Sequence, residues 1–352
     1  NADLNLDDED DDESTTCDGD CDDLDPSREV IDADGDGYST CAGDCDDTDA
    51  TLNLADDDDD GYSTCDDDCD DEDPAIVHCW TAISAGLFQA CGVHRGAPVC
   101  WGADDSGPEP TEYALAEIST GMWNHVCGTT TTATAVCWGR PDYSSALDYV
   151  PTGPSKVIAP GGTFATVSAG AEHSCGIRVP SGTVACWGSN VYGQSAAPAG
   201  TFASLSAGRY STCGIRTSGT LECWGGSVYG EADPPADLPA VTSVSTENAH
   251  ACAVTTTGEA VCWGANGSGQ ATVPPGYEFA TVSTGNIHTC GLTVDGEAVC
   301  WGSNGDGEST PPDEIFRSIS AGWEYTCGIL ADDRAVCWGK NHMGQASPPE
   351  LF

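Results

Sequence analysis

Aspartates at alternate positions dominate the start of the chain. The clearest stretch, DADGDGYSTCAGDCDD, contains Asp32, Asp34 and Asp36, followed by Gly37 and Tyr38. Alternate carboxylates can converge on one hard cation, the glycine permits a sharp turn, and the next residue can offer its backbone carbonyl. This pattern is the first half of a calcium-binding loop, so it predicts bound Ca²⁺.

The aspartate pattern recurs three times with a period of 24 residues, because Cys17, Cys41 and Cys65 have this spacing and so do Cys21, Cys45 and Cys69. The glutamate that closes an EF-hand loop is missing, so later carboxylates must complete each site. The expected ligands are Asp8, Asp10, Asp12, Asp20, Asp23 and Asp25; Asp32, Asp34, Asp36, Tyr38, Asp44, Asp47 and Asp49; and Asp56, Asp58, Asp60, Tyr62, Asp68, Asp71 and Asp73. The alternatives are Mg²⁺, which rarely uses an all-protein cage, and an acidic linker without metal.

The chain has 21 cysteines, a number typical of a secreted or cell-surface protein. Since no signal sequence begins at Asn1, we expect a mature form of a longer precursor. The Cys-x-x-x-Cys pairs of the aspartate repeats favour local disulfides over zinc, because zinc pairs are usually Cys-x-x-Cys and no histidine precedes His78. Cys79 fits neither pattern. It is a free thiol, pairs within the aspartate repeats or forms an intermolecular bond.

Fourteen further cysteines occur in seven repeats that each end in Cys-Trp-Gly. The pairs are Cys91 and Cys100, Cys127 and Cys137, Cys175 and Cys186, Cys213 and Cys223, Cys252 and Cys262, Cys290 and Cys300, and Cys327 and Cys337. A turn signal such as Asp295-Gly296 lies between short β-type runs in each pair, which predicts a hairpin. Loops of two, three or four residues place each pair directly opposite across its hairpin. The spacing therefore predicts seven cross-strand disulfides.

A second landmark precedes each hairpin and predicts another strand, as in the stretch FATVSAG at residues 164–170. Successive first cysteines are 36, 48, 38, 39, 38 and 37 residues apart, which is the scale of a four-stranded propeller blade. We therefore predict an all-β fold with a seven-bladed β-propeller at residues 75–352. The aspartate repeats at residues 1–74 are expected to form a small, loop-rich arm that binds calcium.

The pattern Ser-Ala-Gly-x-x-His-(Ser/Thr)-Cys-Gly, with the Cys-Trp-Gly and Gly-Gln motifs, resembles the regulator of chromosome condensation repeat over roughly residues 80–352. The resemblance implies a seven-bladed propeller. The nuclear founder of that family is a nucleotide exchange factor, but the paired cysteines make this chain more similar to secreted bacterial members, one of which inhibits a β-lactamase through its propeller face. The aspartate repeats resemble thrombospondin type 3 repeats and bacterial Asp-rich metal-binding repeats.

Charge and motif content argue against several classes of function. The 58 acidic and 10 basic residues give a net charge of −48, which argues against nucleic-acid binding because phosphates are bound by Lys and Arg. No stretch approaches the 18 apolar residues of a membrane span. The sequence has neither a His-Glu-x-x-His motif nor a Gly-x-Ser-x-Gly elbow, so we do not expect an enzyme.

Recurring histidines and aromatic residues are the remaining candidates. The histidines His125, His173, His250 and His288 could form a metal or catalytic array, but Gln89, Ser211 and Tyr325 occupy the same position elsewhere, which favours a structural role. The tryptophans after each Cys are expected to pack between blades. Binding residues are expected where the repeats differ. They are Tyr143 and Tyr149 in the long segment 140–162, and Trp123, Tyr210, Trp323 and Tyr325 after the Ser-Ala-Gly turn, near Phe88.

The sequence thus predicts a non-enzymatic extracellular or cell-surface structural protein that assembles through its calcium-bound arm, as a calcium-dependent homo-oligomer or with a protein partner. One alternative is a soluble binding module or inhibitor that captures a protein on one propeller face. Another is an adhesin that binds mineral or matrix calcium.

Overall fold

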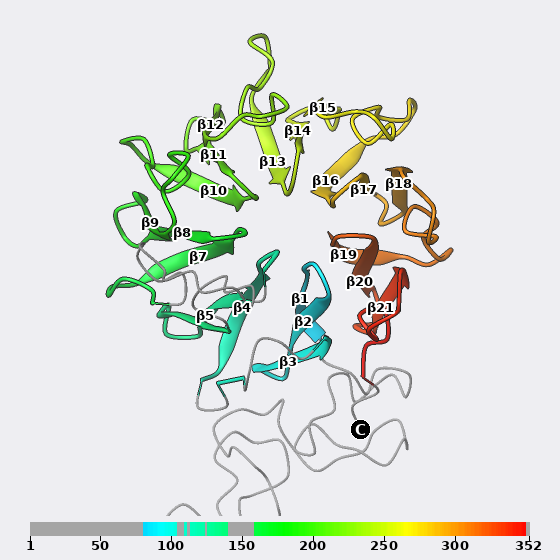
Figure 1. The fold of residues 1–352 in the computed structure, drawn as a ribbon, viewed down its shortest axis with the longest axis horizontal. Helices are drawn as coiled ribbons and strands as arrows, with labels where there is room; N and C mark the ends of the chain where they lie inside the picture. The colour runs from blue at the N-terminus through cyan, green and yellow to red at the C-terminus, as the bar shows by residue number, and fades with distance from the viewer. Residues whose placement is uncertain (1–79, 104–108, 111–112, 124, 140–157, 350–352) are drawn as a thin grey trace, which may run out of the picture. The chain divides into compact units, whose positions relative to one another are not determined.

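The computed structural model describes residues 80–103, 109–110, 113–123, 125–139 and 158–349. These residues lie in a compact unit, Trp80–Leu351. They form seven three-stranded antiparallel sheets and contain no helix. The sheets are arranged as blades around a central axis (Figure 1). The predicted all-β fold with a seven-bladed propeller is confirmed.

Each blade contains three strands whose spatial order follows the chain, with the first strand nearest the axis (Figure 1). The first strands are β1 (Trp80–Ala85), β4 (Leu115–Thr120), β7 (Phe164–Ala169), β10 (Phe202–Ala207), β13 (Val241–Thr246), β16 (Phe279–Thr284) and β19 (Phe316–Ala321). The second strands are β2 (Gln89–His94), β5 (His125–Thr130), β8 (His173–Arg178), β11 (Ser211–Arg216), β14 (His250–Thr255), β17 (His288–Thr293) and β20 (Tyr325–Leu330). The third strands are β3 (Ala97–Gly102), β6 (Ala135–Gly139), β9 (Val184–Gly188), β12 (Leu221–Gly225), β15 (Ala260–Gly264), β18 (Ala298–Gly302) and β21 (Ala335–Gly339).

The prediction of four strands per blade from the repeat length is wrong. In the described part, the segment after the third strand forms turns instead of a fourth strand. Its backbone groups bond locally, as where the side chain of Asn190 accepts from the Ser195 N–H at 3.0 Å and that of Gln194 accepts from the Tyr192 N–H at 2.8 Å. Such local bonds compete with a strand ladder, which explains the missing strand.

The second and third strands form the predicted disulfide hairpins. Cys213 lies opposite Cys223, and every one of the seven pairs is bonded with a Cα to Cα distance of 4.0 Å. The Arg216 N–H bonds to the Thr220 oxygen, which closes a three-residue loop. Because hydrogen-bonded pairs alternate along an antiparallel ladder, the cysteines occupy a non-hydrogen-bonded pair, where Cα atoms approach most closely.

The hydrophobic core lies between neighbouring blades. In one cluster, Cys252 and Val254 of blade 5 pack with Phe279, Val282 and Trp301 of blade 6. The rings of Phe279 and Trp301 have centroids 5.8 Å apart. Each blade therefore completes the core of the next one, as expected for a repeat protein.

Candidate interaction face

A ring of seven serine hydroxyls joins every blade to its neighbour. Each serine is the one in the Ser-Ala-Gly motif or its Ser-Thr variant, and its Oγ accepts a backbone N–H from the first strand of the next blade at 2.8 to 3.0 Å. The serines are Ser84, Ser119, Ser168, Ser206, Ser245, Ser283 and Ser320. This repeat-invariant residue therefore holds the propeller together.

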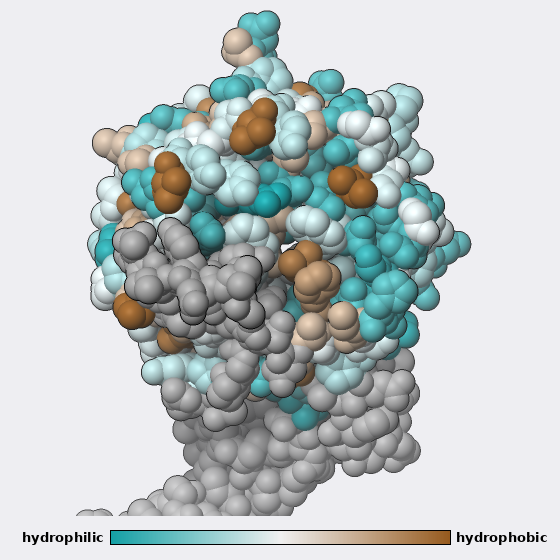
Figure 2. Space-filling view, in the orientation of Figure 1, coloured by the Kyte–Doolittle hydropathy of each residue, from teal (hydrophilic) through white to brown (hydrophobic). Residues whose placement is uncertain are grey.

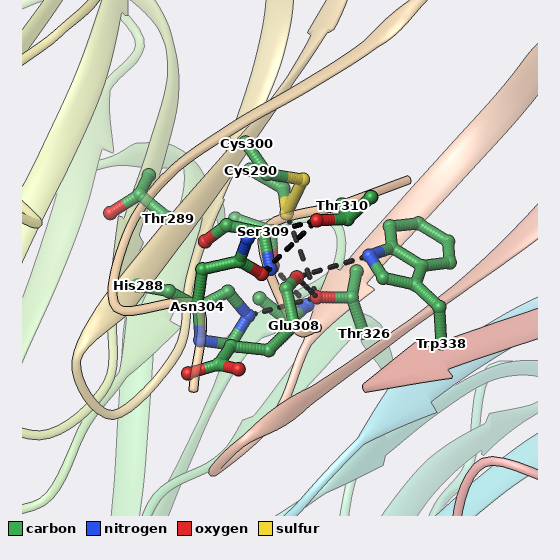
Figure 3. Close-up of a disulfide and its surroundings, with 12 residues drawn as sticks. His288, Thr289, Cys290, Cys300, Asn304, Glu308, Ser309, Thr310, Thr326 and Trp338 are labelled. Carbon is green, nitrogen blue, oxygen red and sulfur yellow. Dashed lines mark hydrogen bonds between the residues drawn. A yellow bond between two sulfur atoms is a disulfide. The ribbon is translucent and has the colours of Figure 1, made fainter. Parts of the chain in front are cut away.

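The recurring histidines also bond between blades. The Nε2 of His288 lies 2.8 Å from the Thr326 hydroxyl of the next blade, beside the Cys290–Cys300 disulfide (Figure 3). Equivalent contacts join His125 to Ser174 at 3.0 Å, His173 to Thr212 at 2.7 Å and His250 to Thr289 at 2.7 Å. All four histidines are fully buried and separated into different blade interfaces, so the arrangement supports their predicted structural role.

The tryptophans of Cys-Trp-Gly extend these bonds to the Gly-Gln motif. The indole N–H of Trp338 donates to the Glu308 backbone oxygen at 3.0 Å (Figure 3), and that of Trp301 donates to Gln270 at 2.9 Å. In each case the acceptor lies in the loop that leads, along the chain, into the blade of the tryptophan. Repeat-invariant cysteines, serines and tryptophans thus serve the scaffold, and the candidate binding residues are those that differ between repeats.

Tyr325 is a scaffold residue, and the prediction that it contacts a partner is wrong. Its side chain is fully buried. Its hydroxyl donates to the Gln89 oxygen at 2.7 Å and accepts the Gly86 N–H at 3.1 Å, which joins blade 7 to blade 1. Burial raises the pKa of the phenol, and the nearby Glu247 charge adds to this rise. Sequence alone did not reveal its burial because an aromatic residue replaces histidine only in this repeat.

The other predicted aromatics of the described part lie on the turns between first and second strands. We call the end of the propeller formed by these turns and by the loops after the third strands the turn face, because antiparallel strands bring them to the same end of each blade. Trp123, Tyr210 and Trp323 are half-buried there, and Phe88 is 36% exposed. In the view of Figure 2, hydrophobic residues form separate patches among hydrophilic ones. Candidate binding residues on such a surface fall into small clusters.

One such cluster is built around Arg209. Its guanidinium carbon lies 4.8 Å from the Tyr210 ring centroid and 5.4 Å from that of Trp123. Its Nη1 donates to the Asn248 side-chain oxygen at 3.1 Å, and Asn248 donates to Asn286 at 2.7 Å. Cation–π contacts and hydrogen bonds therefore fix a Trp-Arg-Tyr group, whose residue types are those enriched at binding hot spots.

Two exposed Val-Tyr pairs on the turn face were not among the predicted residues. Val191-Tyr192 and Val228-Tyr229 occupy the tips of the loops that end in Gly-Gln or Gly-Glu. The available signal was the repeated Val-Tyr-Gly, since the corresponding positions in the last three blades hold Gly-Ser, Gly-Asp or His-Met. The rings of Tyr192 and Tyr210 lie 4.7 Å apart, so one tip adjoins the Arg209 cluster.

Glu247 stands where the other six blades have the motif glycine. A Cβ at Gly170 would lie 2.3 Å from the Gly208 oxygen of the next blade, which explains the preference for glycine in this ring. The Glu247 residue is half-buried, but protein surrounds its carboxyl group, and burial raises the pKa to about 8. Burial, with a smaller contribution from the charge of His288, lowers the pKa of His250, in the same blade, to about 3.

The predicted calcium ligands, the aspartate-repeat cysteines, Cys79, Tyr143 and Tyr149 all lie outside the described residues. Within the described part, no group of three or more His, Cys, Asp or Glu side chains is arranged to hold a metal ion. The same residues include no helix of the length and apolarity needed to cross a membrane.

Comparison with known proteins agrees with this geometry. Four stretches, residues 164–194, 241–270, 279–308 and 316–345, match the family described as regulator of chromosome condensation (RCC1) repeat.

Similar solved structures include two receptor ectodomains. One is the entire ectodomain of the Physcomitrella patens receptor kinase CR4, which is 26% identical with a TM-score of 0.61 over 74% of this chain and 73% of that chain. Another is the CRINKLY WD40 ectodomain of the Arabidopsis thaliana receptor kinase ACR4, at 25% identity and a TM-score of 0.59, covering 74% of this chain and 97% of that chain.

The fold is also similar to that of Prp20p from Saccharomyces cerevisiae, with 12% identity and a TM-score of 0.58 over 70% of this chain and 81% of that chain. At this identity the likeness concerns the fold alone. The seven sheets, the repeat matches and these similar structures together support an RCC1-type β-propeller.

Proposed function

We propose that this chain is a non-catalytic extracellular assembly protein, in which a rigid propeller head at residues 75–352 is joined to a calcium-binding arm at residues 1–74. The observation that carries the proposal is the cross-linking of the head. Seven disulfides fix the hairpins, and the serine ring joins all seven blades. Such a head suits a protein that must keep its shape outside the cell.

Two observations support an extracellular location. Disulfides persist in oxidising compartments and are rare in the cytosol. The similar CR4 and ACR4 structures are receptor ectodomains. Together they point to a site of action outside the cell.

The arm supplies the assembly function in this proposal. Residues 1–78 contain 33 acidic side chains and one basic side chain, Arg28. Calcium ions held by the aspartates of the three repeats would neutralise this charge and stiffen the arm into a spacer or connector between subunits. Cys79, at the junction, would form an intermolecular disulfide.

Limited proteolysis tests the calcium-bound arm. The native protein is digested in calcium and in chelator, and the cleavage sites are mapped by mass spectrometry. We expect new cleavage sites within residues 1–74 in chelator, while the disulfide-bonded propeller persists. An unchanged digestion pattern would contradict calcium binding by the arm.

A Cys79→Ser variant tests the covalent link independently. On a non-reducing gel, wild type should show a dimer or polymer that the variant lacks. Wild-type protein that runs as a single chain would remove the intermolecular role of Cys79.

A second candidate is a soluble module that captures another protein, as the alternative from sequence proposed. The preorganised Trp123, Arg209 and Tyr210 group favours it, because rigid aromatic and Arg anchors lose little entropy on binding. Under this function, Arg209→Ala would abolish partner capture while deletion of the arm would leave it intact. Pull-down with both variants separates the two functions.

A further inference from the structure

The two Val-Tyr tips expose more apolar surface than their structural role requires. Val191 is 80% exposed and Tyr192 50%, and Val228 is 65% and Tyr229 63%. The same loop folds elsewhere with Gly267-Ser268 or Gly305-Asp306 at these two positions. Because the fold tolerates small or charged residues there, Val-Tyr at two neighbouring tips calls for a different explanation. Contiguous exposed apolar groups are a common sign of an interaction surface.

Both tips are rigid. The Tyr192 N–H donates to the buried Gln194 side chain at 2.8 Å, and the Val228 and Tyr229 N–H groups donate to the buried Glu231 carboxylate at 3.2 and 2.7 Å. The hydrogen bonds fix the backbone that presents each pair. A preorganised surface loses less conformational entropy when it binds.

The loop of the first tip carries no charged side chain of its own, and the charged group that adjoins it is the Arg209 cation, 4.8 Å from the Tyr210 ring. The loop SNVYGQSAAPAGT, residues 189–201, contains no Asp, Glu, Lys, Arg or His, although the whole chain carries a net charge of −48. In the second tip, Glu231 is 1% exposed and already bonded within the loop, and the carboxylate of the exposed Asp233 accepts a hydrogen bond from the Ser227 hydroxyl. A basic partner would be attracted to acidic surface over much of the protein. An acidic partner, in contrast, needs a contact with few unpaired acidic groups, because like charges brought together cost free energy.

We propose that the two tips form a self-association surface whose occupant is the same surface of a second copy of this chain. A two-fold dimer requires that residue i of one copy contacts residue j of the other and that j contacts i. Two equivalent tips on neighbouring blades meet this requirement, since Val191-Tyr192 of one copy can pack on Val228-Tyr229 of the other. The inference rests on the proposed assembly function and adds a second contact to the one assigned to the arm.

Light scattering after size-exclusion chromatography tests the dimer, using the full-length, non-reduced Cys79→Ser protein in chelator. These conditions remove both the calcium-dependent and the covalent contributions of the arm. The test variant carries Val191→Asp and Val228→Asp. Its matched control carries Val294→Asp, a change at another valine that is 57% exposed but lies in a hairpin turn at the opposite end of its blade. Thermal unfolding of each variant verifies that the propeller is folded.

We expect the parent and the Val294→Asp control to have twice the mass of one chain, and the double variant to have the mass of one chain. A folded double variant that keeps the dimer mass would overturn the inference. A parent protein that stays monomeric over a 100-fold range of concentration would overturn it as well. If the protein shows no calcium-dependent assembly but still forms the tip dimer, the role of the arm is contradicted and the tip dimer stands. Failure of the proposed arm function is therefore distinguishable from failure of this inference.

Discussion

The indole N–H of Trp101 donates a hydrogen bond to the backbone oxygen of Gln345, 244 residues further along the chain, at 3.0 Å. The same bond joins Trp263 to Glu231 inside the ring at 2.9 Å. We call the junction between blades 7 and 1 the seam. At the seam, the Ala85 N–H also donates to the Ser320 hydroxyl at 2.9 Å. The first and last blades therefore meet through the same kinds of contact that join other neighbouring blades, and the seam is an ordinary blade interface.

Removal of the Trp101 donor should loosen this seam. A Trp101→Phe variant leaves the Gln345 oxygen without its donor, so we expect unfolding free energy to fall by about 1 kcal/mol. Hydrogen exchange should rise in β1 and β19. Trp263→Phe is the matched control and should lose similar stability but raise exchange in β10 and β13 instead. Equal exchange patterns in the two variants would argue against a local seam.

A glycine after the first cysteine makes room for the aromatic residue of the first strand. A Cβ on Gly291 would lie 2.4 Å from the Phe279 ring. Blade 5 has the smaller Val241 at the ring position and Ala253 at the glycine position, both buried. The two positions therefore change together, as close packing requires.

This packing predicts a coupled pair of substitutions. Gly291→Ala should cost about 1 to 3 kcal/mol, because overpacking displaces the ring. In a Phe279→Val background the same change should cost much less, as in blade 5. Urea unfolding of the two single variants and the double variant measures the coupling. Additive losses would show that the clash is relieved by movement elsewhere.

The local part of this fold was predictable from sequence, and the part that depends on neighbouring blades was not. Cys290 and Cys300 flank one short turn, so their spacing alone specifies the pairing. The role of Ser283 was not predicted, because its partner, Ala321, lies in the next blade. Tyr325 was assigned to the surface for the same reason. The exposure of Val191 was not predicted because the Val-Tyr-Gly pattern that it shares with Val228 does not by itself show that the side chain faces outward.

The buried histidines predict loss of stability in acid. Burial lowers the pKa of His173 and His288 from 6.5 to about 4. Between these two pH values the unfolded chain therefore binds protons that the folded chain does not bind. Their contribution is complete above pH 6.5 and is lost as pH falls through about 4. Thermal unfolding between pH 4 and 7 should show this decline. His173→Gln keeps a hydrogen-bonding side chain and should remove part of this loss of stability. An unchanged dependence of stability on pH would contradict the lowered pKa of His173.

The buried carboxyl group of Glu247 predicts the opposite trend, a loss of folding stability as pH rises. Its pKa is raised from 4.5 to about 8, so its contribution is complete below pH 4.5 and is lost as pH rises through about 8. The loss amounts to a few kcal/mol, since each pKa unit corresponds to about 1.4 kcal/mol. Glu247→Gln removes the titrating group and should be more stable than wild type at pH 9 but not at pH 4. A difference that does not depend on pH would contradict a buried carboxyl group.

The molar mass of the native, non-reduced protein in calcium and then in chelator tests the central claim most directly. An assembly protein with a calcium-bound arm and a self-associating propeller should give a large species by light scattering in calcium and a smaller species in chelator that is still larger than one chain. A single chain of unchanged mass in both conditions would contradict the assembly function and favour a propeller that binds a different protein.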